Sequence, residues 1–168
     1  IIHRRRIAVL ALLIASLVFG GVIALASAIG DTERITAYWV GAVLTDDGLY
    51  VTEVIDYDFG AEPRHGIYRR IPDADPSSLS VGSPTAPAKA SITDSQWAAS
   101  TRIGDPDVTI VGRHRYRIDY LLPFDTVVSD GLFAWNAIGD EWTVTIRNVR
   151  ITVAMAPDLD PAQCRPRD

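Results

Sequence analysis

The chain has 168 residues, a net charge of −5 and a single cysteine, Cys164. Three of its 16 basic residues, Arg4, Arg5 and Arg6, precede residue 31, so the remainder carries 13 basic against 21 acidic residues, a net charge of −8. That balance argues against a nucleic-acid binder and a domain lying on anionic lipid, and one cysteine excludes an internal disulfide framework.

An uninterrupted apolar segment, Ile7–Ile29, follows the cluster Arg4-Arg5-Arg6. As a helix it would extend about 34 Å, enough to cross a hydrocarbon core of about 30 Å. Because basic flanks stay on the cytoplasmic side, we expect residues from about 31 onward to lie on the extracytoplasmic side of the plasma membrane. The lipid bilayer is then one partner of the chain, through Ile7–Ile29.

Two interpretations of this segment stay open. It is a retained anchor, or a secretory signal cleaved at the small-residue site Ala26-Ser27-Ala28. We therefore divide the chain into an anchor or signal over 1–30, a domain over 31–156 and a tether over 157–168. Because the chain begins at Ile1 without a methionine and ends in a tail rich in Pro, Asp and Arg, we expect it to be a piece of a longer protein.

Residues 33–59 predict a β-hairpin, because apolar residues alternate in both halves. Asp46-Asp47-Gly48 between the halves is a hairpin turn signal, since glycine accepts the positive φ that such turns need. Glu53 breaks the pattern by lying on the apolar side of its strand. The expected inward faces are Ile35, Ala37, Trp39, Gly41 and Val43 in the first half, and Leu49, Val51, Ile55, Tyr57 and Phe59 in the second.

The next segment, residues 62–72, is cationic and contains two prolines and a glycine. We expect it to cross one end of the sheets rather than to form a long strand. Residues 73–96 are rich in Ser, Pro, Ala and Thr. They either contain two short strands, near 79–81 and 89–93 with a turn at 82–87, or form one long loop.

Residues 108–122 show the clearest strand pattern, with apolar and aromatic residues on one face and mostly charged residues on the other. Because a typical strand has roughly 3–10 residues, we expect Gly112 to mark a bulge or bend. A short strand is expected at 132–136, a turn at 139–140 and a further strand at 141–153. In that last strand the apolar phase shifts after Ile146, which predicts a β-bulge near Arg147-Asn148.

No helical periodicity of useful length follows residue 30. Short strands separated by turn signals, in one domain of this size, predict an all-β fold, an antiparallel immunoglobulin-like β-sandwich. A β-barrel is the alternative.

Several short segments together resemble a known family. The most specific are Arg64-His65-Gly66-Ile67-Tyr68-Arg69 and the pair Trp135-Asn136 and Glu141-Trp142; the others are Glu33-Arg34-Ile35, Val51-Thr52-Glu53, Tyr57-Asp58-Phe59, Ile103-Gly104-Asp105-Pro106 and Gly139-Asp140. Over about residues 31–156 the chain is similar to the extracytoplasmic domain of a bacterial family of predicted membrane proteins, domain of unknown function 2207. The resemblance implies a signal or anchor, a β-rich ectodomain and further membrane helices beyond Asp168. It implies no activity and no catalytic residue.

An inward-facing carboxylate such as Glu53 requires a partner, because an unpaired buried charge is costly. Arg64, Arg69 and Arg70 in the cationic segment are the candidates. We expect a structural ion pair that holds this segment against the hairpin. The alternative is that the arginines bind an anionic ligand.

Metal and nucleophilic chemistry find little support in the sequence. His65 and His114 lack the ligand spacing of a zinc site. The acidic turns at 46–47, 73–75 and 105–107 would offer oxygens to calcium, but turn formation explains each of them. There is no Gly-x-Ser-x-Gly elbow and no glycine-rich phosphate loop, and Cys164 lies in the tail. We expect no cofactor and no metal.

The tryptophans receive a structural interpretation first. Alternation places Trp39 in the core, whereas Trp135 and Trp142 flank a turn and are expected to pack on each other or on the sheet. A sugar-stacking platform is the alternative for this pair.

We therefore expect a non-enzymatic extracytoplasmic interaction or sensing domain. It would bind a protein partner, or associate with itself through an exposed sheet edge, and would bind no nucleic acid. A carbohydrate- or envelope-polymer-binding module is the alternative, and a hydrolase is a third. The candidate ligand- or partner-binding residues are Arg64, His65, Tyr68, Arg69, Trp135 and Trp142.

Overall fold

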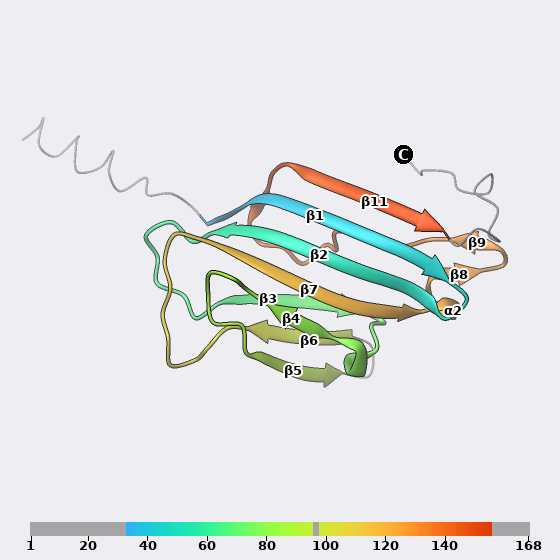
Figure 1. Ribbon diagram of the computed structural model, residues 1–168, viewed down its shortest axis with the longest axis horizontal. Helices are drawn as coiled ribbons and strands as arrows, with labels where there is room; N and C mark the ends of the chain where they lie inside the picture. Colours follow the sequence, from blue (N-terminus) through green and yellow to red (C-terminus); the bar gives the residue numbers. More distant parts are fainter. Residues whose placement is uncertain (1–32, 96–97, 156–168) are drawn as a thin grey trace, which may run out of the picture. The chain divides into compact units, whose positions relative to one another are not determined.

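The computed structural model describes residues 33–95 and 98–155 (Figure 1). The predictions for Ile7–Ile29, for the tether over 157–168 and for Cys164 lie outside the described residues. In the part of the chain that is described, no helix has the length and apolar character needed to cross a bilayer.

The described elements are almost all strands. In chain order they are β1 (Arg34–Thr45), β2 (Gly48–Asp58), β3 (Ile67–Pro72), the 3₁₀ turn η1 (Pro76–Ser78), β4 (Ser80–Gly82), β5 (Ala90–Ser95), β6 (Ala98–Ile103), β7 (Arg113–Pro123), α2 (Phe124–Val127), β8 (Val128–Ser129), β9 (Leu132–Phe133), β10 (Thr145–Ile146) and β11 (Val149–Met155). The predicted all-β class is confirmed.

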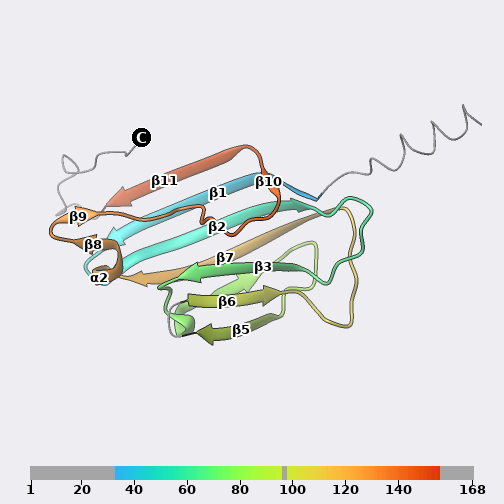
Figure 2. The same ribbon diagram turned by 180° about the vertical axis from the view of Figure 1, so that it is seen from behind.

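Two main sheets make up the domain (Figures 1 and 2). The larger has the order β10-β1-β2-β7-β4, with β11 beside β1, and the smaller has the order β3-β6-β5. Pairing is antiparallel except that β10 and β11 run parallel to β1. Strands β8 and β9 form a separate short hairpin.

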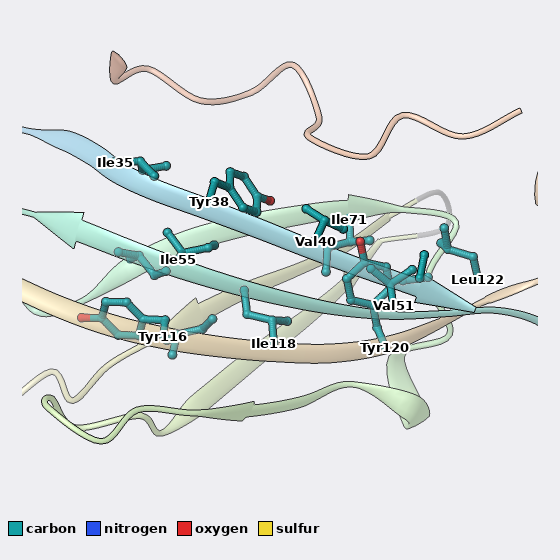
Figure 3. Close-up of a cluster of buried hydrophobic side chains, with 14 of the residues drawn as sticks. Ile35, Tyr38, Val40, Val51, Ile55, Ile71, Tyr116, Ile118, Tyr120 and Leu122 are labelled. Carbon is teal, nitrogen blue, oxygen red and sulfur yellow. The ribbon is translucent and has the colours of Figure 1, made fainter. Parts of the chain in front are cut away.

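One hydrophobic core joins the two sheets (Figure 3). The larger sheet contributes the inner faces of β1, β2 and β7, and the smaller contributes Ile67, Ile71 and Ile103. The second half of the predicted hairpin is confirmed, because Leu49, Val51, Glu53, Ile55 and Tyr57 are all buried. The predicted turn is also confirmed, because β1 ends at Thr45 and β2 begins at Gly48. Gly48 has a φ of +141°, and a Cβ atom there would lie 2.1 Å from the Leu122 carbonyl oxygen, so this position needs glycine.

The inner face of β1 differs from the prediction. The register of β1 against β2 shifts between Ile35 and Ala37, as in a β-bulge, so the alternation changes phase there. The buried residues that follow are Tyr38, Val40, Ala42 and Leu44, whereas Trp39 is half-buried on the outer face and Val43 is exposed. The assignment of Trp39 to the core is therefore wrong.

The predicted irregularity near Arg147-Asn148 separates β10 from β11. It lies beside the irregularity of β1: the Arg147 amide donates to the Ile35 carbonyl, and the Asn148 side chain donates to the Thr36 carbonyl at 2.8 Å. Because both strands are displaced at the same point, their register is unchanged, Ile35 pairing with Ile146 and Tyr38 with Val149. The last strand thus follows the phase change of the first.

Other segments correct the predictions. Residues 67–72 form strand β3 rather than a crossing segment, and β6 was not expected. The two short strands expected within 73–96 exist, but β4 joins the larger sheet and β5 the smaller, so the segment between them passes from sheet to sheet. The long strand begins at Arg113, after Gly112 at φ +76°. The strands expected at 132–136 and 141–153 are reduced to β9, β10 and β11.

Candidate functional site

A buried ion pair lies at the junction of the two sheets. Arg69 on β3 binds Glu53 on β2 through two hydrogen bonds, from Nε to Oε2 at 2.9 Å and from Nη2 to Oε1 at 2.7 Å. Glu53 is fully buried and Arg69 is 4% exposed. This bidentate geometry is the strongest form of an arginine–carboxylate contact.

Two tyrosines complete the coordination of Glu53. The Tyr38 hydroxyl donates to Oε2 and the Tyr120 hydroxyl donates to Oε1, each at 2.8 Å. Glu53 lies opposite Val40 of β1 and Ile118 of β7, so both tyrosines are its diagonal neighbours, within reach of an aromatic side chain. Sheet register thus brings Glu53, Tyr38 and Tyr120 together, and Arg69 joins them from β3 of the smaller sheet. We call these four residues the Glu53 network.

The loop before β10 closes over this network. The Arg69 guanidinium lies over the Trp142 ring, with its central carbon 5.4 Å from the ring centroid, and Trp142 also packs edge-on against Tyr38. The Trp142 indole donates to the Ile138 carbonyl at 3.0 Å. Gly139 adopts φ +77°, which favours glycine, and a Cβ atom there would lie 2.8 Å from Nη1 of Arg69.

Burial and charge define the protonation states in the network. Burial, reinforced by the nearby Glu53 carboxylate, raises the pKa of Tyr38 and of Tyr120 well above the usual value. Burial alone would lower the pKa of Arg69, but hydrogen bonds to Glu53 and its charge raise it. The tyrosines therefore remain protonated donors and Arg69 remains a cation.

Of the three arginines proposed as partners of Glu53, only Arg69 fills that role. Arg64 forms a salt bridge with Glu33, and Arg70 forms an exposed one with Glu141. His65 lies 3.1 Å from the Val108 carbonyl through Nδ1, and Tyr68 is 70% exposed. The structure therefore does not gather the Arg64–Arg69 segment into one site. Arg64 and His65 precede β3, and alternation along β3 places Tyr68 and Arg69 on opposite faces.

The two flanking tryptophans have different surroundings. Trp142 packs on Tyr38 and Arg69, whereas half-buried Trp135 lines an open cavity of about 600 Å³ beside the network. Other lining residues are Arg69, Asp73, Tyr120, Asn136 and Asp140. The cavity could accept a small polar ligand with one flat apolar face.

A row of exposed aliphatic side chains lies on β11. Val149, Ile151 and Val153, which we call the β11 row, are 47%, 46% and 42% exposed. They pair with Tyr38, Val40 and Ala42 of β1, all buried, so the row continues the apolar face of the sheet past the edge of its core. Among the described residues, only β1 pairs with β11.

Other acidic side chains and the two histidines of the domain make local contacts. No group of three or more His, Asp, Glu or Cys side chains suited to a metal occurs within residues 33–95 and 98–155. Asp75 accepts from the Ser77 amide and Asp105 pairs with Lys89 at 2.7 Å, as turn residues do. His114 lies within hydrogen-bonding distance of the carbonyls of Thr85 and Val111.

Sequence reasoning missed two members of the Glu53 network. Tyr120 was expected to face inward but was not linked to Glu53, and Tyr38 was placed on the outer face because the shift at Thr36 was not anticipated. The Arg147-Asn148 phase shift was visible in the sequence. That shift would have predicted an inward-facing Tyr38 only if the last strand had been expected to pair with the first, because paired strands share the displacement.

Comparison with known proteins gives one match. The family model described as "Predicted membrane protein (DUF2207) N-terminal domain" matches residues 34–163. No curated protein and no solved structure matches the chain significantly. The match covers every described strand and names no activity.

Proposed function

The chain belongs to the DUF2207 family of predicted membrane proteins, and we propose that its described domain is a non-enzymatic protein-interaction module on the extracytoplasmic side of the membrane. The observation that carries this proposal is the β11 row, three aliphatic residues exposed on an edge strand. Uncovered apolar edges are where folded domains add a strand from a partner.

The Glu53 network supports an interaction role over catalysis. Both oxygens of Glu53 accept hydrogen bonds from Arg69 and from a tyrosine, so the carboxylate has no free position for a substrate. The network instead joins the larger sheet to β3 of the smaller one. A rigid two-sheet body is what a docking strand needs beside it, because a mobile edge would lose affinity on ordering.

In this proposal, the side of the membrane on which the domain lies is inferred from the sequence. Arg4-Arg5-Arg6 before the apolar segment Ile7–Ile29 favours a cytoplasmic N-terminus and an exported domain. We further infer that the two sheets form an immunoglobulin-like sandwich, an architecture shared by many cell-surface domains.

Cysteine labelling in intact cells tests side and docking together. In the full chain carrying Cys164→Ser, single cysteines replace Tyr68, Val43 or Ile151, and a membrane-impermeant maleimide is added. Val43 is the matched control for Ile151, because both side chains are aliphatic, both are 46% exposed and their strands are adjacent. We expect Tyr68→Cys and Val43→Cys to label readily, and Ile151→Cys to label roughly tenfold more slowly, since it reacts only when the docked strand opens.

Two results would contradict the proposal. If Tyr68→Cys labels only after the cells are permeabilised, the assigned side is wrong. If Ile151→Cys labels as fast as Val43→Cys, no partner covers β11.

A second candidate function rests on the Trp135 cavity. An indole face beside Asp73, Asn136 and Asp140 has the composition of a carbohydrate site, in which an aromatic ring stacks on the sugar and polar groups bind its hydroxyls. Titration of the full chain with soluble cell-wall oligosaccharides, by calorimetry, tests this proposal. Binding lost in Trp135→Ala and kept in Tyr68→Ala supports it, whereas no heat with the unaltered chain rejects it.

A further inference from the structure

The edge of β11 that faces away from β1, with which no described strand pairs, presents the backbone of the same residues that form the β11 row. The Tyr38 amide donates to the Asn148 carbonyl at 3.3 Å, and in a parallel ladder alternate residues face the neighbouring strand. Asn148, Arg150, Thr152 and Ala154 therefore direct their backbone groups toward β1. Val149, Ile151 and Val153 direct their N–H and C=O groups away from β1.

This combination favours a β-strand over a lipid surface as the occupant. Lipid would cover the aliphatic side chains but would leave the backbone groups of Val149, Ile151 and Val153 without partners, which costs several kcal/mol for each group in hydrocarbon. An added strand would cover the aliphatic side chains and would also bind the backbone groups. The edge has little of the usual protection, because β11 contains no proline, and Arg150 is its one charged residue.

We propose that this strand is β11 of a second copy of the chain, paired antiparallel around Ile151; the inference rests on the proposed interaction function and names its partner. Centred on Ile151, the register places Val149 of each copy opposite Val153 of the other. These odd-numbered residues then form the hydrogen-bonded pairs of the ladder, because their backbone groups point toward the edge.

The strand is complementary to itself in this register. On the row side, each aliphatic residue meets another aliphatic residue. On the opposite side, Arg150 meets Thr152 of the second copy. The two arginines therefore avoid a direct cross-strand pair of like charges, which would be destabilising. A two-fold axis perpendicular to the sheet makes one continuous sheet with both rows on the same face.

Disulfide trapping of the full chain in its native membrane tests the register. In the Cys164→Ser background, Ile151→Cys is expected to form a covalent dimer under mild oxidation. Thr152→Cys is the matched control: its two copies would be more than about 7 Å apart between Cα atoms, beyond disulfide reach. Coexpressed Arg150→Cys and Thr152→Cys chains, by contrast, are expected to cross-link with each other.

The outcomes separate this inference from the proposed function. Dimers from Ile151→Cys but not from Thr152→Cys support self-pairing. Slow maleimide labelling of Ile151→Cys without any covalent dimer overturns self-pairing and keeps the interaction function, with another partner or another segment of the chain on β11. Fast labelling without a dimer overturns both. Equal dimer yields from Ile151→Cys and Thr152→Cys also overturn the register.

Discussion

The Glu53 network and the β11 row depart from the usual distribution of polar and apolar groups in opposite directions. In the network, a charged pair lies in the core, and every oxygen of Glu53 is hydrogen-bonded by residues of the same domain. On β11, aliphatic side chains face water on an edge strand that pairs, within the described residues, only with β1. The first departure is compensated within the domain, whereas no element of the described residues covers the second.

The same structural irregularity creates both features. The register shift in β1 turns Tyr38 inward to reach Glu53, and the matching break at Arg147-Asn148 turns Val149, Ile151 and Val153 to the same face. Substitutions in the two regions should therefore have separable effects. Changes in the network should alter stability, and changes in the row should alter association.

The largest expected effect is that of Glu53→Gln. Breaking a buried ion pair leaves an uncompensated charge, here Arg69, and costs about 3–5 kcal/mol of the free energy of unfolding. Thermal unfolding of the full chain in detergent measures the loss. Glu141→Gln, which removes an exposed carboxylate from Arg70, is the control and should cost less than about 1 kcal/mol. An unchanged melting temperature for Glu53→Gln would show that the pair does not hold the sheets together.

Alkaline pH should produce the next largest effect, through Tyr38 and Tyr120. Their folded-state pKa values are raised above the unfolded value of about 10, so their contribution is fully present below pH 10 and is lost as the pH rises further. At pH 11 each would remove on the order of 1 kcal/mol of stability. Burial likewise raises the pKa of Tyr116 to about 12. Melting temperatures measured between pH 8 and 11 check this prediction, and tyrosinate absorbance reports when the tyrosines ionise. A melting temperature that stays constant above pH 10 would contradict it.

Removing one hydroxyl from the network should have a smaller effect than removing the Glu53 charge. Tyr38→Phe leaves the Arg69 pair intact and deletes one of four hydrogen bonds to Glu53, so we expect a loss of about 1.5–3 kcal/mol. Chemical denaturation measures it. Tyr50→Phe, at a half-exposed position on β2, is the control. Equal effects of the two substitutions would mean that the Tyr38 hydroxyl contributes nothing specific.

The smallest expected effect on stability is that of Ile151→Thr. The side chain is 46% exposed and threonine also favours strands, so the free energy of unfolding should change by less than about 0.5 kcal/mol. Association through β11 should nevertheless weaken, because a hydroxyl replaces apolar contact in the centre of the row. Sedimentation of the full chain in detergent, with Val43→Thr as control, measures this. If the Ile151→Thr dimer has the same affinity as the unaltered dimer, the β11 row does not take part in association.

Several features could be predicted from the sequence because they depend on neighbouring residues alone. Strict alternation identified the inner faces of β2 and β7, Asp46-Asp47-Gly48 identified the turn, and the phase change after Ile146 identified the break in the last strand. The same alternation placed Glu53 inside, and an inward carboxylate requires a partner whatever the fold is.

Tertiary structure decided which groups meet. Arg64, Arg69 and Arg70 are equivalent as charges. Alternation along β3 turns Arg69 inward with Ile67 and Ile71, but only the packing of β3 against the larger sheet places it on Glu53. Likewise, nothing local in Val149–Met155 shows that this strand lies parallel to β1 at the edge of the sheet, where its apolar side chains have no cover. A period of two residues reports which face a side chain occupies. What lies opposite that face depends on strand pairings between residues far apart in the chain, which the local pattern does not encode.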